Sequence, residues 1–404
     1  MDQRSHGTRM RLLVAAVAIG WVFGCDRPAN SGSAPPKELT LIYTNSNNGE
    51  LKDCGCPHHP LGGMARRAKW VQDLKQGGTS GGVSQPSRQV VQVDAGDGFF
   101  AYLSPSLPAS PSDQAKAKVI ARALAKMGED AVNVGAQDFA AGLDFLQNDL
   151  AGKNHLPVIS SNLYDKQKQD YPFPRQLVLE RAGLRIGVFG LIQDLPPERA
   201  GNLEVKDPQQ AAREMVSQLR GKCDLVIGLM NMEFEQAAQL AKQAPGIDLV
   251  VVSRGSRATP QPFLAEGSLV VQAGYRGKQL GRMDIQMKPG GYDAQALKQR
   301  EQLRRDREEL EAQRKILEGQ QTQADPQFKA KYDEVVRKIA EADRRLKQIH
   351  GGFENQNSMV DVELSLPEDP QIAQWTAEVL GPSQPPAPPA APMMPAPPPA
   401  PAQP

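Results

Sequence analysis

Short apolar runs rich in β-branched residues alternate with helical stretches between Lys37 and Met287. The apolar runs predict buried β-strands at 39–43, 89–93, 131–134, 158–160, 184–189, 224–229, 247–252 and 269–272. The intervening stretches predict helices that include 62–75, 113–127, 208–219 and 233–243. Alternation on this scale predicts an α/β fold in which layers of helix cover buried sheets.

A highly charged segment, Asp293–His350, differs in kind from the rest of the chain. Of its 58 residues, 26 are charged, 14 basic and 12 acidic. In its second half, apolar residues follow one another at alternating spacings of four and three: Phe328, Tyr332, Val335, Ile339, Ala342, Leu346 and Ile349. In its first half, leucines recur every seven residues, at Leu303, Leu310 and Leu317. This spacing is typical of coiled coils. The break at 319–326 predicts that the two helices fold back as an antiparallel hairpin.

A further strand is predicted at 359–364, beyond the charged segment. The hairpin, 291–352, is therefore expected to be an insertion into one main domain made of 38–290 and 353–381. Two roles for it remain open: a stiff solvated arm, or a surface that docks a partner protein or a second copy of the chain.

The amino terminus has the pattern of a bacterial export signal. Three arginines precede an apolar run, 12–24, of thirteen residues, which is shorter than the roughly 20 residues needed to span a bilayer. We therefore expect 1–24 to be a signal peptide. The run ends in Val-Phe-Gly-Cys25, which resembles a lipobox, so Cys25 is expected to be acylated and to anchor the chain to a membrane of the cell envelope, facing the periplasm or exterior. The alternative is a secreted protein with a chance cysteine.

Two flanking segments are expected to contribute nothing to a core. Residues 25–37 are rich in Pro, Ser, Gly and Asn and predict a flexible tether, in which Asp26 favours the inner membrane. Residues 382–404 contain 12 of the 34 prolines and predict an extended, unpacked tail.

Composition excludes two classes of protein. The 47 basic side chains nearly balance the 46 acidic ones, so no nucleic-acid partner is expected. The mean hydropathy of −0.47, with only 5% aromatic residues, excludes a multi-span membrane protein.

Four groups of motifs, in order along the chain, carry a resemblance to a known family. Segments 39–51 (LTLIYTNSNNGEL) and 62–68 (GGMARRA) are similar to an opening strand, a TNDxHG loop and a GGLARRA helix. Segment 93–100 (VDAGDGFF) is similar to LDAGD, and 134–146 (VGAQDFAAGLDFL) to LGNHEFDYGLDFL. Segments between 224 and 285 are similar to VLSH, PGIDVIIGGHSHT and VQAGxxGKxLGRLD.

This ordered set resembles the N-terminal domain of the 5′-nucleotidase family of calcineurin-like metallophosphoesterases. The resemblance implies an α/β fold: a four-layer sandwich of two β-sheets flanked by helices, here with the antiparallel helical hairpin inserted. It also implies a hydrolase whose two divalent cations polarise a phosphate and ionise a water.

The residues that the resemblance assigns to the metal centre are mostly unsuited to metal binding. Asp97 matches the bridging aspartate of the family, and Asp138 stands in place of a glutamate. The other matched positions carry Ser46, Asn48, Ala136, Gln137, Asn231, Ser256 and Ala258. Neutral amides and hydroxyls do not repay the dehydration of two dications as carboxylates and imidazoles do. A dinuclear Mn or Zn centre is therefore not expected, and neither is efficient hydrolysis by the two-metal route.

A cysteine- and histidine-rich loop lies between the first ligand motif and GGMARRA. Its sequence, Asp53-Cys54-Gly55-Cys56-Pro57-His58-His59, resembles that of a subgroup of exported 5′-nucleotidase-like proteins with a Cys-Gly-Cys loop, some of which carry selenocysteine there. We expect the loop at the carboxyl end of the first strand, near the position of the metals in the family.

Three hypotheses for this loop remain open. Cys54 and Cys56 could act as a redox pair, whose small ring would make an oxidising disulfide. With His58, His59 or both they could bind Zn or Cu. They could also form a structural disulfide in an oxidising compartment. Cys223 belongs to an apolar strand and is expected to be inert core.

Two further groups of charged residues are weaker candidates for a functional site. Asp94, Asp97 and Asp138 could bind one hard cation or simply cap loops, and Arg254 and Arg257 could meet an anion or be paired at the surface. The leading hypothesis is a lipid-anchored envelope protein with thiol redox or soft-metal chemistry at Cys54 and Cys56. A non-catalytic binding or scaffold protein and a residual metal-dependent phosphoesterase are the alternatives.

Overall fold

The computed structural model of the chain describes residues 37–53, 55, 56, 59–80, 83, 84, 86–319 and 326–381. The predicted signal peptide, the tether up to residue 36 with Cys25, and the predicted tail at 382–404 lie outside the described residues, as do Cys54 and His58. Among the described helices, none combines the length and the apolar character needed to cross a membrane.

The first of two six-stranded sheets has a parallel centre. Its order is β16-β15-β1-β4-β5-β6, with bounds Phe353–Asp361, Gln279–Met287, Glu38–Thr44, Val90–Asp94, Ala131–Asn133 and Val158–Ile159. Strands β1, β4, β5 and β6 pair in parallel, whereas β15 and β16 add to the β1 edge in antiparallel fashion. The carboxyl ends of the parallel strands therefore meet at one edge of the sheet.

The second sheet repeats this arrangement. Its order is β13-β14-β12-β11-β9-β8, with bounds Phe263–Ala265, Ser268–Val271, Leu249–Ser253, Leu225–Asn231, Leu184–Ile192 and Gln176–Arg181. Strands β9, β11, β12 and β14 are parallel, and β8 and β13 are antiparallel edges. Two short ribbons accompany the sheets, β2 with β3 (Thr79–Ser80 and Val83–Ser84) and β7 with β10 (Leu163–Asp165 and Leu203–Val205).

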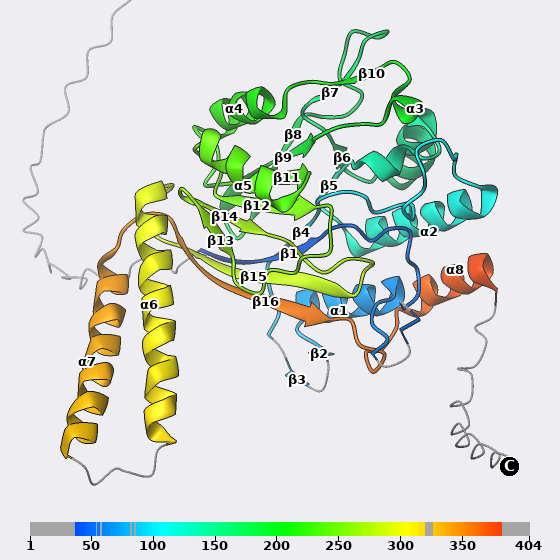
Figure 1. Cartoon of the computed structure of the whole chain (residues 1–404). Helices are drawn as coiled ribbons and strands as arrows, with labels where there is room; N and C mark the ends of the chain where they lie inside the picture. Colours follow the sequence, from blue (N-terminus) through cyan, green and yellow to red (C-terminus); the bar gives the residue numbers. More distant parts are fainter. Residues whose placement is uncertain are drawn as a thin grey trace, which may run out of the picture. The chain divides into compact units, whose positions relative to one another are not determined.

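The two sheets face each other across one apolar core, and helices cover their outer faces (Figure 1). Leu41 and Val93 of the first sheet belong to the same buried cluster as Ile227 and Val251 of the second. Helices α1 (Met64–Gln76) and α2 (Pro111–Met127) pack on the first sheet, α8 (Pro370–Leu380) packs against α1 and α2, and α4 (Pro208–Leu219) and α5 (Phe234–Gln243) pack on the second sheet. The predicted four-layer α/β sandwich is confirmed.

Short helical segments lie near the carboxyl edges of the strands. They are a 3-10 turn at Ala136–Phe139, a π-helix at Phe145–Gly152 and the single turn α3 at Pro197–Ala200. The 3-10 turn and α3 carry residues of the candidate site described below.

The charged segment forms two long helices between β15 and β16, as Figure 1 shows. Helix α6 spans Ala294–Glu318 and α7 spans Pro326–Gln348, and Leu317, Val335 and Ile339 are buried between them. The first turns of α6 join the body of the protein: Leu297 enters the core between the sheets, and the buried Glu301 accepts a hydrogen bond from Asn355. We call α6 and α7 together the helical hairpin.

Several strands differ from the sequence prediction. The edge strands β8 and β13 and the short strands β2, β3, β7 and β10 were not predicted. Strand β15 was recognised only as part of a motif, and β16 begins at Phe353 rather than at 359. The reason is that the first residues of β16, Phe353–Ser358, are polar apart from the phenylalanine and largely half-exposed at the edge of the sheet. Such a strand lacks the apolar run by which buried strands are recognised.

Candidate functional site

Loops that follow β1, β4, β5, β9, β11 and β12 converge on a polar cluster centred on Asp97. The turn after β4 holds Asp97 at φ 58°, and Ser46 and Asn48 beside it are also left-handed, at φ 46° and 51°. The backbone N–H groups of Ser46 and Asn48 donate to the carbonyls of Gly96 and Asp97 at 2.9 and 3.0 Å. Left-handed conformations of residues other than glycine are strained and cluster at functional sites, which identifies this edge as the candidate site.

Both carboxylate oxygens of Asp97 accept hydrogen bonds from neutral donors. Oδ1 accepts from the backbone N–H of Gln137 at 2.9 Å, and Oδ2 accepts from Nδ2 of Asn231 at 2.7 Å. The Asp97 residue is only 6% exposed. The structure thus brings together three residues that the resemblance placed at the metal centre.

The neighbouring carboxylates of Asp138 and Asp94 hold the turn in shape. Asp138 is fully buried and accepts from the N–H groups of Asp97, Phe99 and Gly135 at 3.0, 3.0 and 2.8 Å. Burial raises the pKa of Asp138, and the charge of Asp97 raises it further. Asp94 accepts from Thr44 Oγ1 at 2.6 Å and from the N–H of Gly96 at 2.9 Å.

Asn231, at the end of β11, is engaged on both ends of its amide. Its Nδ2 donates to Asp97 and, at 2.6 Å, to Ser253 Oγ. Its Oδ1 accepts from the N–H of Ala136 at 3.3 Å and from Nε of Arg254 at 3.1 Å. The orientation of the amide is therefore determined by its partners.

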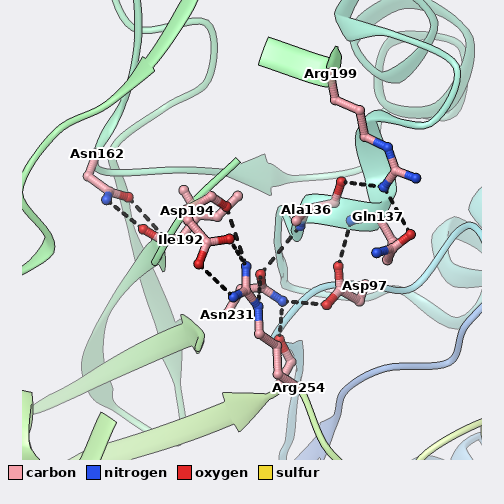
Figure 2. A network of polar contacts seen from close by, with 10 residues as sticks. Asp97, Ala136, Gln137, Asn162, Ile192, Asp194, Arg199, Asn231 and Arg254 are labelled. Carbon is pink, nitrogen blue, oxygen red and sulfur yellow. Dashed lines mark hydrogen bonds and ion pairs between the residues drawn. The ribbon is translucent and has the colours of Figure 1, made fainter. Parts of the chain in front are cut away.

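Arg254, the first residue after β12, brings a positive charge to this cluster (Figure 2). Its two terminal nitrogens donate to the carboxylate of Asp194 at 3.0 and 2.9 Å, in the forked geometry of arginine–carboxylate pairs. Burial alone would lower the pKa of Arg254, but the hydrogen bonds and charge of Asp194 and the charge of Asp97 raise it overall.

The loop after β12 also contains Ser256 and Ala258, the two positions matched to imidazoles of the family. Ser256 is exposed, and it is Arg254 that reaches Asn231. Because β12 ends at Ser253, Arg254 is the residue that lies directly at the carboxyl edge of the strand. Arg257 lies further out, where it pairs with Glu235 at 3.1 Å.

Arg199, in α3, flanks Asp97 on the opposite side and was missed in the sequence. It donates to Oε1 of Gln137 at 2.9 Å, to the carbonyl of Ala136 at 3.1 Å and to the carbonyl of Leu103 at 2.9 Å. The residue is only 8% exposed. It belongs to none of the motifs that carry the resemblance, so nothing in the sequence marked it.

This arrangement does not fit a pair of divalent cations. Asp97, Asp138 and Asn231 offer oxygens, but each of these oxygens already accepts an N–H donor. Two guanidinium groups stand beside them, and like charges repel a dication. Within the described part of the chain, no three His, Cys, Asp or Glu side chains gather in a way that could hold a metal ion.

The Cys-Gly-Cys loop is the second candidate site, and its base is described. Asp53 and Gly62 form an antiparallel bridge, and Leu61 pairs with Glu363 just beyond β16. A Cβ on Gly62 would lie 3.4 Å from the carbonyl of Gly277. The backbone N–H of Arg276, the residue before Gly277, donates to the carbonyl of Ser46 at 2.7 Å. The base of the loop thus lies against the segment around Arg276, which in turn contacts Ser46 in the turn beside Asp97.

Within this loop, Cys56 is disulfide-bonded, and Gly55 and His59 are exposed. Asp53 Oδ1 accepts from the N–H of Gly55 at 3.0 Å. Cys54, Pro57 and His58 lie outside the described residues. Cys223, by contrast, is a free cysteine whose pKa is raised by burial, and its predicted position in the core is confirmed.

Comparison with known proteins defines the class of the fold. No family model matches the chain. The structure superposes on a 5′-nucleotidase precursor from Thermus thermophilus with a TM-score of 0.56, at 17% identity, covering 85% of this chain and 58% of the other. It also matches the calcineurin-like phosphoesterase YfkN from Bacillus subtilis with a TM-score of 0.50, at 18% identity, covering 63% and 87%. The chain therefore has the calcineurin-like phosphoesterase fold.

Comparison of the sequence with curated proteins finds 5′-nucleotidases among its relatives. A 5′-nucleotidase of Vibrio parahaemolyticus is 25% identical over 321 residues, which are 70% of this chain and 54% of that protein. The homologues of the chain are thus 5′-nucleotidases, and the chain spans about half the length of these curated relatives.

Proposed function

We propose that this chain is a lipid-anchored protein of the cell envelope that has the 5′-nucleotidase fold but does not hydrolyse phosphoesters by the two-metal route. We further propose that its activity is thiol–disulfide exchange between the Cys54–Cys56 pair and a substrate dithiol. The observation that carries the proposal is the disulfide at Cys56, in a loop whose described neighbours Gly55 and His59 are exposed.

The reaction is a two-electron exchange with a dithiol in a protein of the same compartment. A thiolate of the substrate attacks one sulfur of the Cys54–Cys56 disulfide and forms a mixed disulfide, and the other cysteine leaves as a thiolate. The second thiol of the substrate then displaces the remaining cysteine. The substrate is oxidised to a disulfide, Cys54 and Cys56 are reduced, and two protons pass with the two electrons.

The surroundings of the loop favour this chemistry. Helix α1 begins at Met64, directly after the base of the loop, and its N-cap residue Gly63 has no side chain to cap the helix. The positive end of the helix dipole stabilises nearby thiolates and so makes cysteines there better leaving groups. Arg66, in the first turn, adds a positive charge that is shared with Glu368 at 2.7 Å.

The test is a redox titration of residues 37–381 carrying Cys223→Ser, so that only the loop thiols are labelled. Thiols are trapped with a mass label across defined glutathione ratios, and Cys54→Ser and Cys56→Ser serve as matched single-cysteine controls. We expect one two-electron transition with a midpoint at about −270 to −120 mV, and no such transition in either control.

The other outcomes would contradict the proposal. A disulfide that resists reduction below about −300 mV would be structural. It would favour a non-catalytic binding protein, with the helical hairpin as its arm for a partner protein or a second copy. Thiols that never pair, and that react with the label only after a chelator is added, would indicate a Zn or Cu site with His58 and His59.

A further inference from the structure

The turn around Asp97 poses an electrostatic problem. Asp97 is 6% exposed and Asp138 is 0% exposed, and the two carboxyl groups hold the same short turn. Their hydrogen-bond donors are backbone and amide N–H groups, which carry no net charge. Buried carboxylates that lack a compensating positive charge are strongly destabilising.

Two guanidinium groups stand on opposite sides of this turn. Arg254 donates to Oδ1 of Asn231, whose Nδ2 donates to Asp97. Arg199 donates to Oε1 of Gln137, whose backbone N–H donates to the other oxygen of Asp97. Figure 2 shows the resulting chain of contacts, from Arg254 through Asn231, Asp97 and Gln137 to Arg199.

Each arginine is held in place by partners outside this chain of contacts. The two terminal nitrogens of Arg254 are held by Asp194, whose side chain is 63% exposed, so that water screens the charge of this carboxylate. Arg199 is fixed by the carbonyl of Leu103, and among the described residues no carboxylate forms an ion pair with it. Arg254 also adopts φ 88°, a strained conformation that persists only where the surroundings enforce it.

We propose that Arg254 and Arg199 replace the two metal ions of this fold as the positive charges that balance Asp97 and Asp138. The side-chain amide of Asn231 and the peptide group between Ala136 and Gln137 transmit this compensation, because each accepts from a guanidinium on one side and donates to Asp97 on the other. The centre is in this way a metal-free structural centre, with its cations supplied by the chain itself.

The first test measures the charge coupling. Arg254→Met removes the guanidinium but keeps an unbranched side chain, Arg254→Lys keeps the charge, and Asp97→Asn removes the charge that is balanced. We expect Arg254→Met to lower the melting temperature by about 3–6 °C and Arg254→Lys to lower it by less than half as much. In the double variant Arg254→Met with Asp97→Asn, the loss should be clearly smaller than the sum of the single losses. Additive losses, or a lysine variant as unstable as the methionine variant, would overturn the proposal.

A second test needs no variant to fold. The wild-type protein is dialysed against millimolar MnCl₂ and then against metal-free buffer, and bound manganese is measured by mass spectrometry. Manganese is chosen because thiolates do not favour it. We expect far less than one manganese per chain, and a melting temperature that neither EDTA nor MnCl₂ changes. Manganese retained at one or two ions per chain, with a melting temperature that falls in EDTA, would overturn the inference.

Discussion

At the scale of single residues, Gly281 in β15 shows how strongly the absence of a side chain at one position determines the packing. It lies opposite Tyr43 of β1, and a Cβ built on it would lie 1.9 Å from Cζ of Tyr43. The tyrosine ring is fully buried over this glycine, and its hydroxyl donates to Asn357 at 2.9 Å. No rotation of a methyl group relieves such an overlap, so the ring or the strand must move.

We predict that Gly281→Ala lowers the free energy of unfolding by about 1–3 kcal/mol, or prevents folding, because the added methyl overpacks the core. The measurement is urea unfolding followed by circular dichroism. Gly221→Ala is the matched control: nothing lies within 4 Å of a Cβ there and φ is not positive, so this change should stay within about 0.5 kcal/mol. An equal effect of both substitutions would mean that the overlap with Tyr43 has no energetic consequence.

Single residues also set the limit of what the sequence could predict about the site. Asp97, Gln137 and Asn231 were found because they stand in recognisable motifs, and the structure brings them together. Arg199 was not found, because it is 62 positions from Gln137 and only folding places the two in contact. Arg254 was noted as a candidate for an anion contact or a surface pair, but its hydrogen bond to Asn231, 23 positions away, could not be predicted because it depends on the fold.

At the scale of elements, α8 is held to α2 by one acidic residue. Asp369 caps α8 by accepting from the N–H groups of Gln371 and Ile372, and it pairs with Lys126 of α2 at 2.6 Å. Burial acts to raise the pKa of Asp369, but the hydrogen bonds from Lys126 and from the start of α8 outweigh it and lower the pKa. A depressed carboxyl pKa adds stability above the unfolded pKa and loses it as the pH falls through the folded one.

We therefore predict that Asp369→Asn costs about 0.5–1.5 kcal/mol of unfolding free energy at pH 7, because asparagine still caps the helix but loses the charge. The difference from wild type should shrink as the pH falls from about 4, the pKa of the unfolded carboxyl, through the lower pKa of the folded protein, below which the wild-type carboxyl is protonated as well. Urea unfolding across this pH range measures it. Lys126→Met should reproduce most of the loss at pH 7, and a loss in Asp369→Asn that is independent of pH would contradict the assignment.

Elements were predictable from the sequence where their residues are buried. The central strands were found from their apolar runs, because both faces of β9, β11 and β12 are covered. Strand β8, with half of its side chains facing outward, and the polar strand β16 carry no such pattern. The helices α6 and α7 were predictable because their apolar seam repeats at regular spacings.

At the scale of the whole molecule, the proposed anchor at Cys25 makes a prediction of its own. Several acyl chains on one cysteine bind a protein firmly to a membrane surface. We expect the full chain, expressed with its leader, to sediment with the membrane fraction and to partition into detergent, and Cys25→Ser to be recovered in the soluble fraction. Cys223→Ser, which removes a buried thiol, should behave like the wild type. A Cys25→Ser protein that still partitions into detergent would exclude lipid attachment at this residue.

The helical hairpin leaves and re-enters the body at one point, because Gly351 N–H donates to Pro289 and Gly352 N–H donates to Gly291, both at 2.7 Å. Beyond the first turns of α6, which contact the core and β16, a change in the hairpin does not disturb the pairing of β15 with β16. The outer part of the hairpin can therefore lengthen or shorten by whole heptads in both helices, each of which changes its reach by about 10 Å. For the proposed role as an arm that docks a partner, such a change would alter the distance to the partner while the two sheets stay unchanged.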